Sequence, residues 1–407
     1  MAKELLKRSE VKEEYTWKVS DMYESTAEWE QALNQVKEIA DRIAGMEGRV
    51  TESAANLYQV LKDCDAYGEI IDLTFNYAQR LYDQDRNDST HQAMSQKVYG
   101  VWADVAGMIS FIEPEILAVP EEQLETFYKE LPELESYRGK IAEIQRLRGH
   151  SLSAEMEKLL AMTSEMSQTP EQVFAVMNSA DIRFPEITDE NGEKVRLTHG
   201  NYVLFLQSAD RRVRKEAFEA MYSVYKQFVN TFAGLYNGQV KQQIFFAKAR
   251  KYDSTLDAAL TANNVSVKVY ENLLDTVSAN MDKLHRYVKL RKKCLGLDEL
   301  HMYDIYTPMI ADAARKVPFE EAKETVLKAL APLGEEYVAK VKEGFENRWI
   351  DVYENEGKCT GAYSAGAYGT HPYVLLNYSE TLDDMFTLAH EMGHAMHSFY
   401  SNSTQPF

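Results

Sequence analysis

The sequence predicts a mainly α-helical protein of several lobes, with a small β-sheet next to a helix that carries paired histidines. The chain has 407 residues, 45% of them hydrophobic, and is therefore long enough to bury more than one core. Residues 1–113 contain no proline and are rich in helix formers. Alternation of apolar and polar residues, which is typical of strands, appears in only a few short segments. Helices therefore dominate the predicted fold.

The first predicted lobe covers residues 1–113. Its clearest helix begins after Ser25, where Ser25 and Glu28 form a capping-box pattern, and it ends at Gly45. The apolar residues of this segment recur at the spacing of one helix face, which predicts an amphipathic helix packed on a core. These residues are Trp29, Leu33, Val36, Ile39, Ala40 and Ile43.

Two more lobes follow, over residues 114–200 and 201–407. Pro114 and Pro120 break the helical pattern at the first boundary, and helical periodicity resumes over residues 154–166. The second lobe ends in a predicted β-hairpin over residues 182–200, with its turn at residues 189–192. The third lobe begins with helices whose aromatic residues we assign to core packing. Strand patterns return over residues 348–357 and 371–378, just before the histidines.

Composition and charge exclude several classes of partner. A net charge of −19 disfavours a nucleic-acid partner, because affinity for that backbone comes largely from Lys and Arg, and the basic run at residues 211–215 is predicted to be a solvated helix face. No segment approaches the roughly 18 apolar residues of a membrane span, and no signal-peptide pattern is present. We therefore expect no membrane partner and a cytoplasmic location. Three scattered cysteines, Cys64, Cys294 and Cys359, predict reduced thiols.

The segment from residue 381 to residue 399 predicts a helix that carries the pattern H-E-x-x-H at His390, Glu391 and His394. Thr381 is placed to cap this helix. An apolar stripe runs along it through Met385, Leu388, Met392, Met396 and Phe399. His390 and His394 are one turn apart on one face, so both imidazoles can bind a single zinc ion. Glu391, which follows a ligand directly, is placed to act as general base on water. The alternative is a buried helix with two hydrogen-bonded histidines and a surface glutamate.

His397 is not expected to bind the same ion. It lies seven residues after His390, about 10.5 Å along the helix axis. The pattern of zinc proteases with a third histidine would need Gly and His at positions that His397 and Tyr400 occupy. His397 is therefore predicted to pack or to face substrate. The third ligand should be acidic, yet no Asp or Glu follows Glu391 in the sequence.

The Gly- and Tyr-rich segment at residues 361–378 leads into the histidine helix. If residues 374–377 form an edge strand, its free backbone groups can pair with an extended peptide. A tight turn with inward-packed tyrosines fits the same residues equally well.

With these motifs in view, the sequence resembles oligoendopeptidase F, within the thimet-oligopeptidase-like zinc metallopeptidases. The resemblance extends from about residue 15 to the end and is carried by residues 181–202, 247–260, 361–378 and 381–407. It implies a multi-lobed helical basket around a deep channel, a zinc cofactor, and cleavage of internal bonds in short peptides. His390 and His394 correspond to zinc ligands and Glu391 to the catalytic acid and base.

In that family a glutamate roughly two dozen residues after the second histidine completes the zinc site. We therefore expect the third ligand beyond Phe407, a chain that is cut short, and weak zinc binding and poor activity for these 407 residues. The competing hypothesis is a catalytically silent helical module that binds peptides. A chelator distinguishes the two, because only the peptidase loses its activity.

Overall fold

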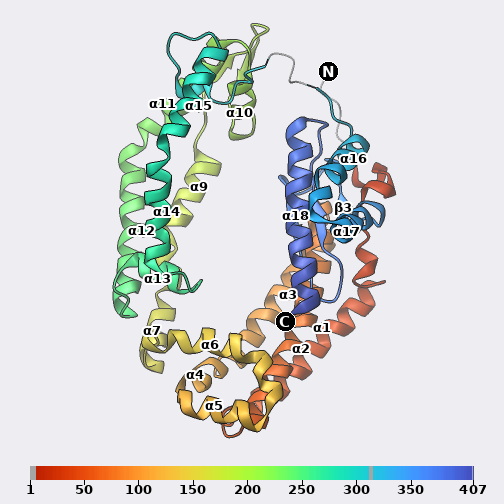
Figure 1. Ribbon diagram of the computed structural model, residues 1–407, viewed down its shortest axis with the longest axis vertical. Coiled ribbons are helices and arrows are strands. Elements are labelled where there is room, and N and C mark those ends of the chain that lie inside the picture. The colour runs from red at the N-terminus through yellow and green to blue at the C-terminus, as the bar shows by residue number, and fades with distance from the viewer. Residues whose placement is uncertain (1–5, 311–314, 406) are drawn as a thin grey trace. The chain divides into compact units, whose positions relative to one another are not determined.

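The computed structural model describes residues 6–310, 315–405 and 407. Helices make up most of them, and the strands form one two-stranded and one three-stranded sheet, so the mainly α prediction is confirmed (Figure 1). The chain divides into two compact units. Unit 1 contains residues 1–146 and 314–407, and unit 2 contains residues 147–313. The boundaries predicted after residues 113 and 200 stay predictions.

Unit 1 begins with a helical part whose three long helices lie side by side (Figure 1). Ser25 accepts a hydrogen bond from the Glu28 amide at the start of α1, as predicted from the capping pattern. Its six predicted apolar residues are all buried. The helices of this part are α1 (Thr26–Ala44), α2 (Ala54–Gln84), α3 (Ser89–Met108), α4 (Ile112–Ala118), α5 (Glu121–Glu130) and α6 (Arg138–Arg146).

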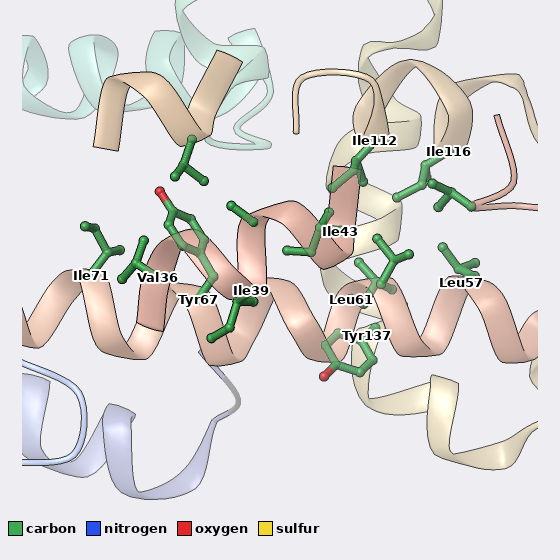
Figure 2. Close-up of a cluster of buried hydrophobic side chains, with 14 of the residues drawn as sticks. Val36, Ile39, Ile43, Leu57, Leu61, Tyr67, Ile71, Ile112, Ile116 and Tyr137 are labelled. Atoms are coloured by element: carbon green, nitrogen blue, oxygen red, sulfur yellow. The ribbon is translucent and has the colours of Figure 1, made fainter. Parts of the chain in front are cut away.

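One hydrophobic core joins these helices. Figure 2 shows Ile43 of α1, Leu61 of α2, and Ile112 and Ile116 of α4 in one cluster. Full burial of each such side chain contributes about 1.5–3 kcal/mol before entropy is counted. The same cluster includes Tyr373 and Leu375 from far along the chain, so the helical part also packs against the sheet that follows.

The second part of unit 1 contains the three-stranded sheet and the histidine helix. Its elements are α16 (Phe319–Ala329), α17 (Glu335–Glu346), β3 (Ile350–Asp351), β4 (Tyr363–Ala365), β5 (Tyr373–Leu375) and α18 (Leu382–Thr404). A second core of buried side chains, among them Trp349, Leu388 and Met392, holds α18 on the sheet and on α16 and α17. The predicted small sheet beside this helix is therefore confirmed.

The strand order is β3-β5-β4, with β5 in the centre. β3 pairs with β5 in parallel, with Ile350 opposite Val374, and β4 pairs with it antiparallel, with Ser364 opposite Val374. The prediction that residues 374–377 form an edge strand is therefore wrong, because neighbours occupy both sides of β5. Within the Gly- and Tyr-rich segment, the strand at the edge of the sheet is β4.

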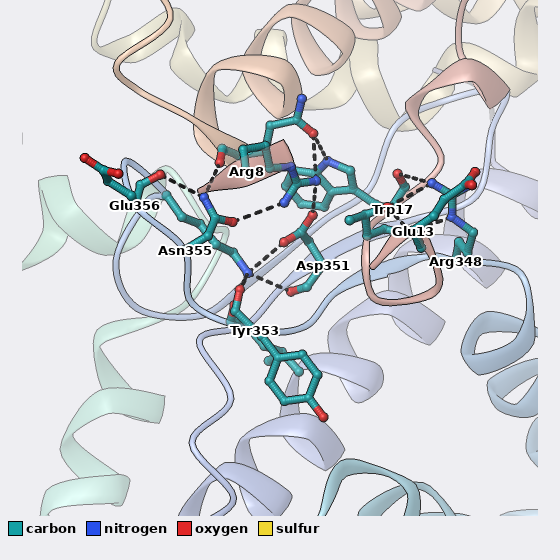
Figure 3. A network of polar contacts seen from close by, with 12 residues as sticks. Arg8, Glu13, Trp17, Arg348, Asp351, Tyr353, Asn355 and Glu356 are labelled. Carbon is teal, nitrogen blue, oxygen red and sulfur yellow. Dashed lines mark hydrogen bonds and ion pairs between the residues drawn. The ribbon is translucent and has the colours of Figure 1, made fainter. Parts of the chain in front are cut away.

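A buried polar network ties the N-terminal segment to this sheet (Figure 3). The Lys358 ammonium lies 2.7 Å from the Asp351 carboxylate, and both side chains are fully buried. Arg8 donates to the same carboxylate at 2.6 Å, from 343 residues earlier in the chain. Lys358 also donates to the carbonyl oxygens of Asp351, Tyr353 and Leu376. Burial lowers the pKa of Lys358, while Asp351 opposes that shift.

Unit 2 contains the predicted hairpin and a set of helices. β1 (Glu186–Thr188) pairs antiparallel with β2 (Lys194–Arg196), which confirms the hairpin. The helices are α7 (Ala154–Met162), α8 (Ser164–Ser167), α9 (Thr169–Val176), α10 (His199–Gln207), α11 (Arg211–Gln227), α12 (Val229–Ala249), α13 (Thr255–Thr261), α14 (Val267–Ala279) and α15 (Met281–Cys294).

The basic run at residues 211–215 is only partly solvated. Arg214 is buried and donates to Asp304 at 2.9 Å, and Arg211 binds the other oxygen of that carboxylate at 3.0 Å. Asp304 is itself fully buried, so it needs these cations to offset the cost of its charge. The prediction of a solvated face is therefore wrong for Arg214.

Candidate active site

Helix α18 positions the predicted site. The Thr381 hydroxyl accepts a hydrogen bond from the Asp384 amide, and the Asp384 carboxylate accepts from the Thr381 amide, which completes a capping box. The buried side chains Leu388, Met392 and Met396 anchor the helix on the second core. The helix is thus fixed at its first turn and along one face, and the opposite face carries the histidines.

The structure brings His390 and His394 together on that exposed face. Their Nε2 atoms lie 3.1 Å apart, and their rings are nearly perpendicular at 83°. Two nitrogen ligands of one tetrahedral zinc ion, each at about 2.0–2.1 Å, are about 3.3 Å apart. The distance between the two nitrogens is therefore close to the one that a shared zinc ion requires.

The described residues bring two candidate ligands together and contain no complete metal cluster. Within residues 6–310, 315–405 and 407, no group of three or more His, Cys, Asp or Glu side chains is placed to hold an ion. Asp384 is engaged at the helix start, where Ser379 and Thr381 donate to its Oδ2. His397 lies exposed on α18 and joins no such group of described residues.

Glu391 lies between the two histidines in the sequence. Its side chain is buried, and 8% of its surface is exposed. Among the described residues its carboxylate has no hydrogen-bond or ion-pair partner. The alternative with two hydrogen-bonded histidines placed this glutamate on the surface, so its burial differs from that alternative. A carboxylate that is held by packing and left free of partners stays available to accept a proton from water.

Strand β4 lies against α18. A second polar network connects β4 to helix α2. The Tyr363 hydroxyl donates to Asp83 at 2.8 Å, and the Arg80 guanidinium lies 4.9 Å from the centre of the Tyr363 ring. Burial raises the pKa of Tyr363, so this hydroxyl keeps its proton. Arg80 and Asp83 were not predicted, because nothing local in the sequence indicates that α2 contacts a strand about 280 residues later.

Gly366, at the end of β4, makes the close approach to α18 possible. A Cβ atom at this position would lie 2.5 Å from the Ser398 Cβ. Only glycine fits there without a shift of the strand or the helix. The outer edge of β4 pairs with no other strand in the described part of the chain, so the backbone groups on that edge have no strand partner there.

No helix within the described residues is long and apolar enough to cross a bilayer. The three cysteines are free, and Cys359 accepts a hydrogen bond from Arg86 at 2.9 Å.

Comparison with known proteins places these features in a family. Residues 204–407 match peptidase family M3, and residues 115–184 match oligopeptidase F. Oligopeptidase PepF of Bacillus subtilis is 45% identical over 406 residues, which cover 100% of this chain and 61% of that protein. An oligoendopeptidase F homologue of Lactococcus lactis is 38% identical over 98% of this chain and 67% of its own length.

Solved structures show the same fold. A crystal structure from Chlamydophila abortus matches 99% of this chain and 68% of its own chain, with a TM-score of 0.84 and 31% identity. Oligoendopeptidase F from Enterococcus faecium matches 92% of this chain and 63% of its own, with a TM-score of 0.64 and 36% identity. The chain thus spans about three fifths of the length of its Bacillus relative. On these matches and on its histidine helix, the chain belongs to peptidase family M3, with an N-terminal region of the oligopeptidase F type.

Proposed function

We propose that this chain carries the catalytic helix of a zinc-dependent endopeptidase that cleaves internal bonds of short peptides. The observation that supports it most directly is the pair of Nε2 atoms 3.1 Å apart on the exposed face of α18, with Glu391 beside them. Membership in family M3 and the names of the relatives agree with this proposal. The cytoplasmic location predicted from the sequence remains part of the proposal.

The division of roles follows from the side chains. His390 and His394 hold the metal through neutral imidazoles. Zinc, when bound, polarises the scissile carbonyl and makes water a stronger acid. Glu391 accepts the proton of the attacking water and then gives it to the leaving amine, because its carboxylate has no competing partner among the described residues. No acyl intermediate on the protein is needed. The third metal ligand belongs to a residue other than these three.

The substrate backbone is proposed to pair with the outer edge of β4. Because β5 is central, the peptide-pairing role that the sequence suggested for residues 374–377 passes to Tyr363–Ala365. A strand edge gives backbone hydrogen bonds that do not depend on sequence, which suits an enzyme that acts on many short peptides. The contacts of Tyr363 with Asp83 and Arg80 keep this edge in place.

The test is hydrolysis of a quenched fluorescent peptide by zinc-loaded protein, before and after treatment with a chelator. We expect slow cleavage, because the described residues bring only two candidate zinc ligands together, and this cleavage should disappear with the chelator and return with zinc. Peptide binding without cleavage, unchanged by the chelator, would instead support a silent binding module. Absence of both binding and cleavage would reject the proposal.

A further inference from the structure

A second candidate site lies along α18, beyond the histidines. A cavity of about 290 Å³ opens between α2, the segment after β4 and the C-terminal half of α18. All three walls belong to unit 1. The cavity is lined by Asp72, Gly366, Tyr368, Ser398, Ser401, Asn402, Gln405 and Phe407.

This cavity continues the face of α18 that carries the histidines. Ser398 and Ser401 follow His394 by four and seven residues, the spacing of neighbours on one helix face. They therefore lie about 6 and 10 Å along the axis from His394. An extended peptide advances about 3.3 Å per residue, so the cavity lies about two to three residues from a bond held at the histidines.

The walls of the cavity are fixed by contacts of their own. The Tyr368 hydroxyl donates to the Gln405 carbonyl at 2.6 Å, and the Tyr368 ring meets Phe407 edge to face at 5.4 Å. Gly366 forms the wall where β4 meets Ser398. A peptide paired with the outer edge of β4 is thus led to this cavity at the end of the strand.

Among the described residues that line the cavity, Asp72 has the only charged side chain. Its Oδ2 accepts a hydrogen bond from the Tyr368 amide at 2.9 Å, and its Oδ1 accepts one from the Asn76 side-chain amide at 3.0 Å. No Lys, Arg or His among the described residues forms an ion pair with it, and nearby Arg80 is paired with Asp83. Burial raises the pKa of Asp72, although the Tyr368 amide, the charge of Arg80 and the Asn76 side chain oppose that shift.

We propose that this cavity is a substrate subsite that binds a cationic nitrogen of the peptide through Asp72. The proposal rests on the proposed peptidase function. The carboxylate keeps unused lone pairs, and hydroxyl and amide groups from α18 line the same cavity. The nitrogen comes either from a Lys or Arg side chain or from the free amino terminus, and both offer the same charged N–H donors.

The experiment measures binding of three labelled peptides by fluorescence anisotropy, in a Glu391→Gln background so that they are not cleaved. The first peptide has one lysine and a free amino terminus. In the second, norleucine replaces the lysine, and in the third the amino terminus is acetylated. We expect one of the two changes to weaken binding by about tenfold or more, the usual effect of losing a charge-assisted hydrogen bond. The change that does so identifies the source of the nitrogen.

Asp72→Asn should remove that discrimination, so that the matched peptides bind equally. Asp41→Asn, the same charge change at an exposed position of α1, should retain it. If Asp72→Asn does not fold, Ser401→Lys tests the same point, because its ammonium occupies the cavity and should also remove the discrimination.

Equal binding of all three peptides to the parent protein would overturn the subsite, and so would discrimination that survives both Asp72→Asn and Ser401→Lys. If none of the three peptides binds, the proposed peptidase function is overturned, and the subsite with it.

Discussion

The Nε2 atoms of His390 and His394 lie 3.1 Å apart on α18, while Glu391, between them in sequence, is buried. Loss of a residue that only hydrogen-bonds a metal ligand lowers metal affinity by roughly 10–100-fold. Replacing either histidine with alanine should lower zinc affinity by more than that, because it removes a ligand itself. His397→Ala is the matched control, because His397 is exposed on the same helix and lies outside the pair. Calorimetric titration with zinc measures all three variants. Equal losses for His397→Ala and His394→Ala would contradict the assignment.

Glu391→Gln should separate metal binding from turnover. The amide keeps the shape of the side chain but cannot accept the proton of water, so peptide hydrolysis should fall by about 10²–10⁴-fold. Zinc content, measured on the same sample by mass spectrometry of the native protein, should stay nearly unchanged. A zinc-loaded variant that still cleaves at the parent rate would remove Glu391 from the mechanism.

Lys358→Met should destabilise unit 1 strongly. The substitution leaves Asp351 fully buried with Arg8 as its remaining cation, and it removes one hydrogen-bond donor from each of three carbonyl oxygens (Figure 3). Breaking a buried pair in this way costs about 3–5 kcal/mol. Urea denaturation followed by circular dichroism measures the loss. Lys342→Met, in an exposed pair with Glu346 on α17, should change the free energy of unfolding by no more than about 0.5 kcal/mol.

Gly366→Ala should push β4 away from α18. The added methyl group would lie 2.5 Å from the Ser398 Cβ, and overpacking of this kind costs about 1–3 kcal/mol. Ser398→Gly removes the opposing atoms at a cost of about 1 kcal/mol for glycine in a helix. In a double-mutant cycle the two substitutions together should cost less than the sum of the single effects. Strict additivity would show that the two residues do not meet.

The ion pair between Glu157 and Arg250 in unit 2 should make the free energy of unfolding depend on pH. Both carboxylate oxygens accept from the guanidinium at 2.8 Å, and this pairing lowers the pKa of Glu157 below its ordinary value of 4.5. The pair therefore adds stability above pH 4.5, and the gain is lost as pH falls through the lower, folded-state pKa. Because about a third of each side chain is exposed, the gain is about 1 kcal/mol at most.

The measurement compares Glu157→Gln with the parent protein by urea denaturation from pH 7 to pH 3. The difference in free energy of unfolding should be largest at neutral pH and should shrink below pH 4.5. Glu271→Gln, at an exposed position of α14, should show no such trend. A difference that grows as the solution becomes more acidic would contradict the shift.

Local patterns predicted local structure well. The Ser25 cap and the six apolar residues of α1 agree with the structure, and so do the Thr381 cap of α18 and the hairpin turn after Thr188. Each depends on residues within one or two turns of one another, so the sequence contains the whole signal.

Pairings between distant segments were beyond prediction. The sequence gives no sign that β3 and β4 take both sides of β5, so Val374 was expected at an edge and lies in the centre. Likewise, the apolar and aromatic residues that mark β4 do not indicate that Asp83 of α2 binds Tyr363. Arg214 was predicted to lie in solvent because it belongs to a run of basic residues. The sequence does not reveal its buried partner, Asp304, which is 90 residues away.

The ion pair between Arg8 and Asp351 has a consequence for synthesis on the ribosome. Unit 1 cannot close until Asp351 has emerged, about 200 residues after the end of α6. At about 5–20 residues per second, the first six helices wait roughly 10–40 s for their sheet. During that delay the apolar surface that later receives Tyr373 and Leu375 stays open, while unit 2, which is encoded within the gap, is complete and free to fold. The nascent helical part therefore exposes this apolar surface for the whole of the delay.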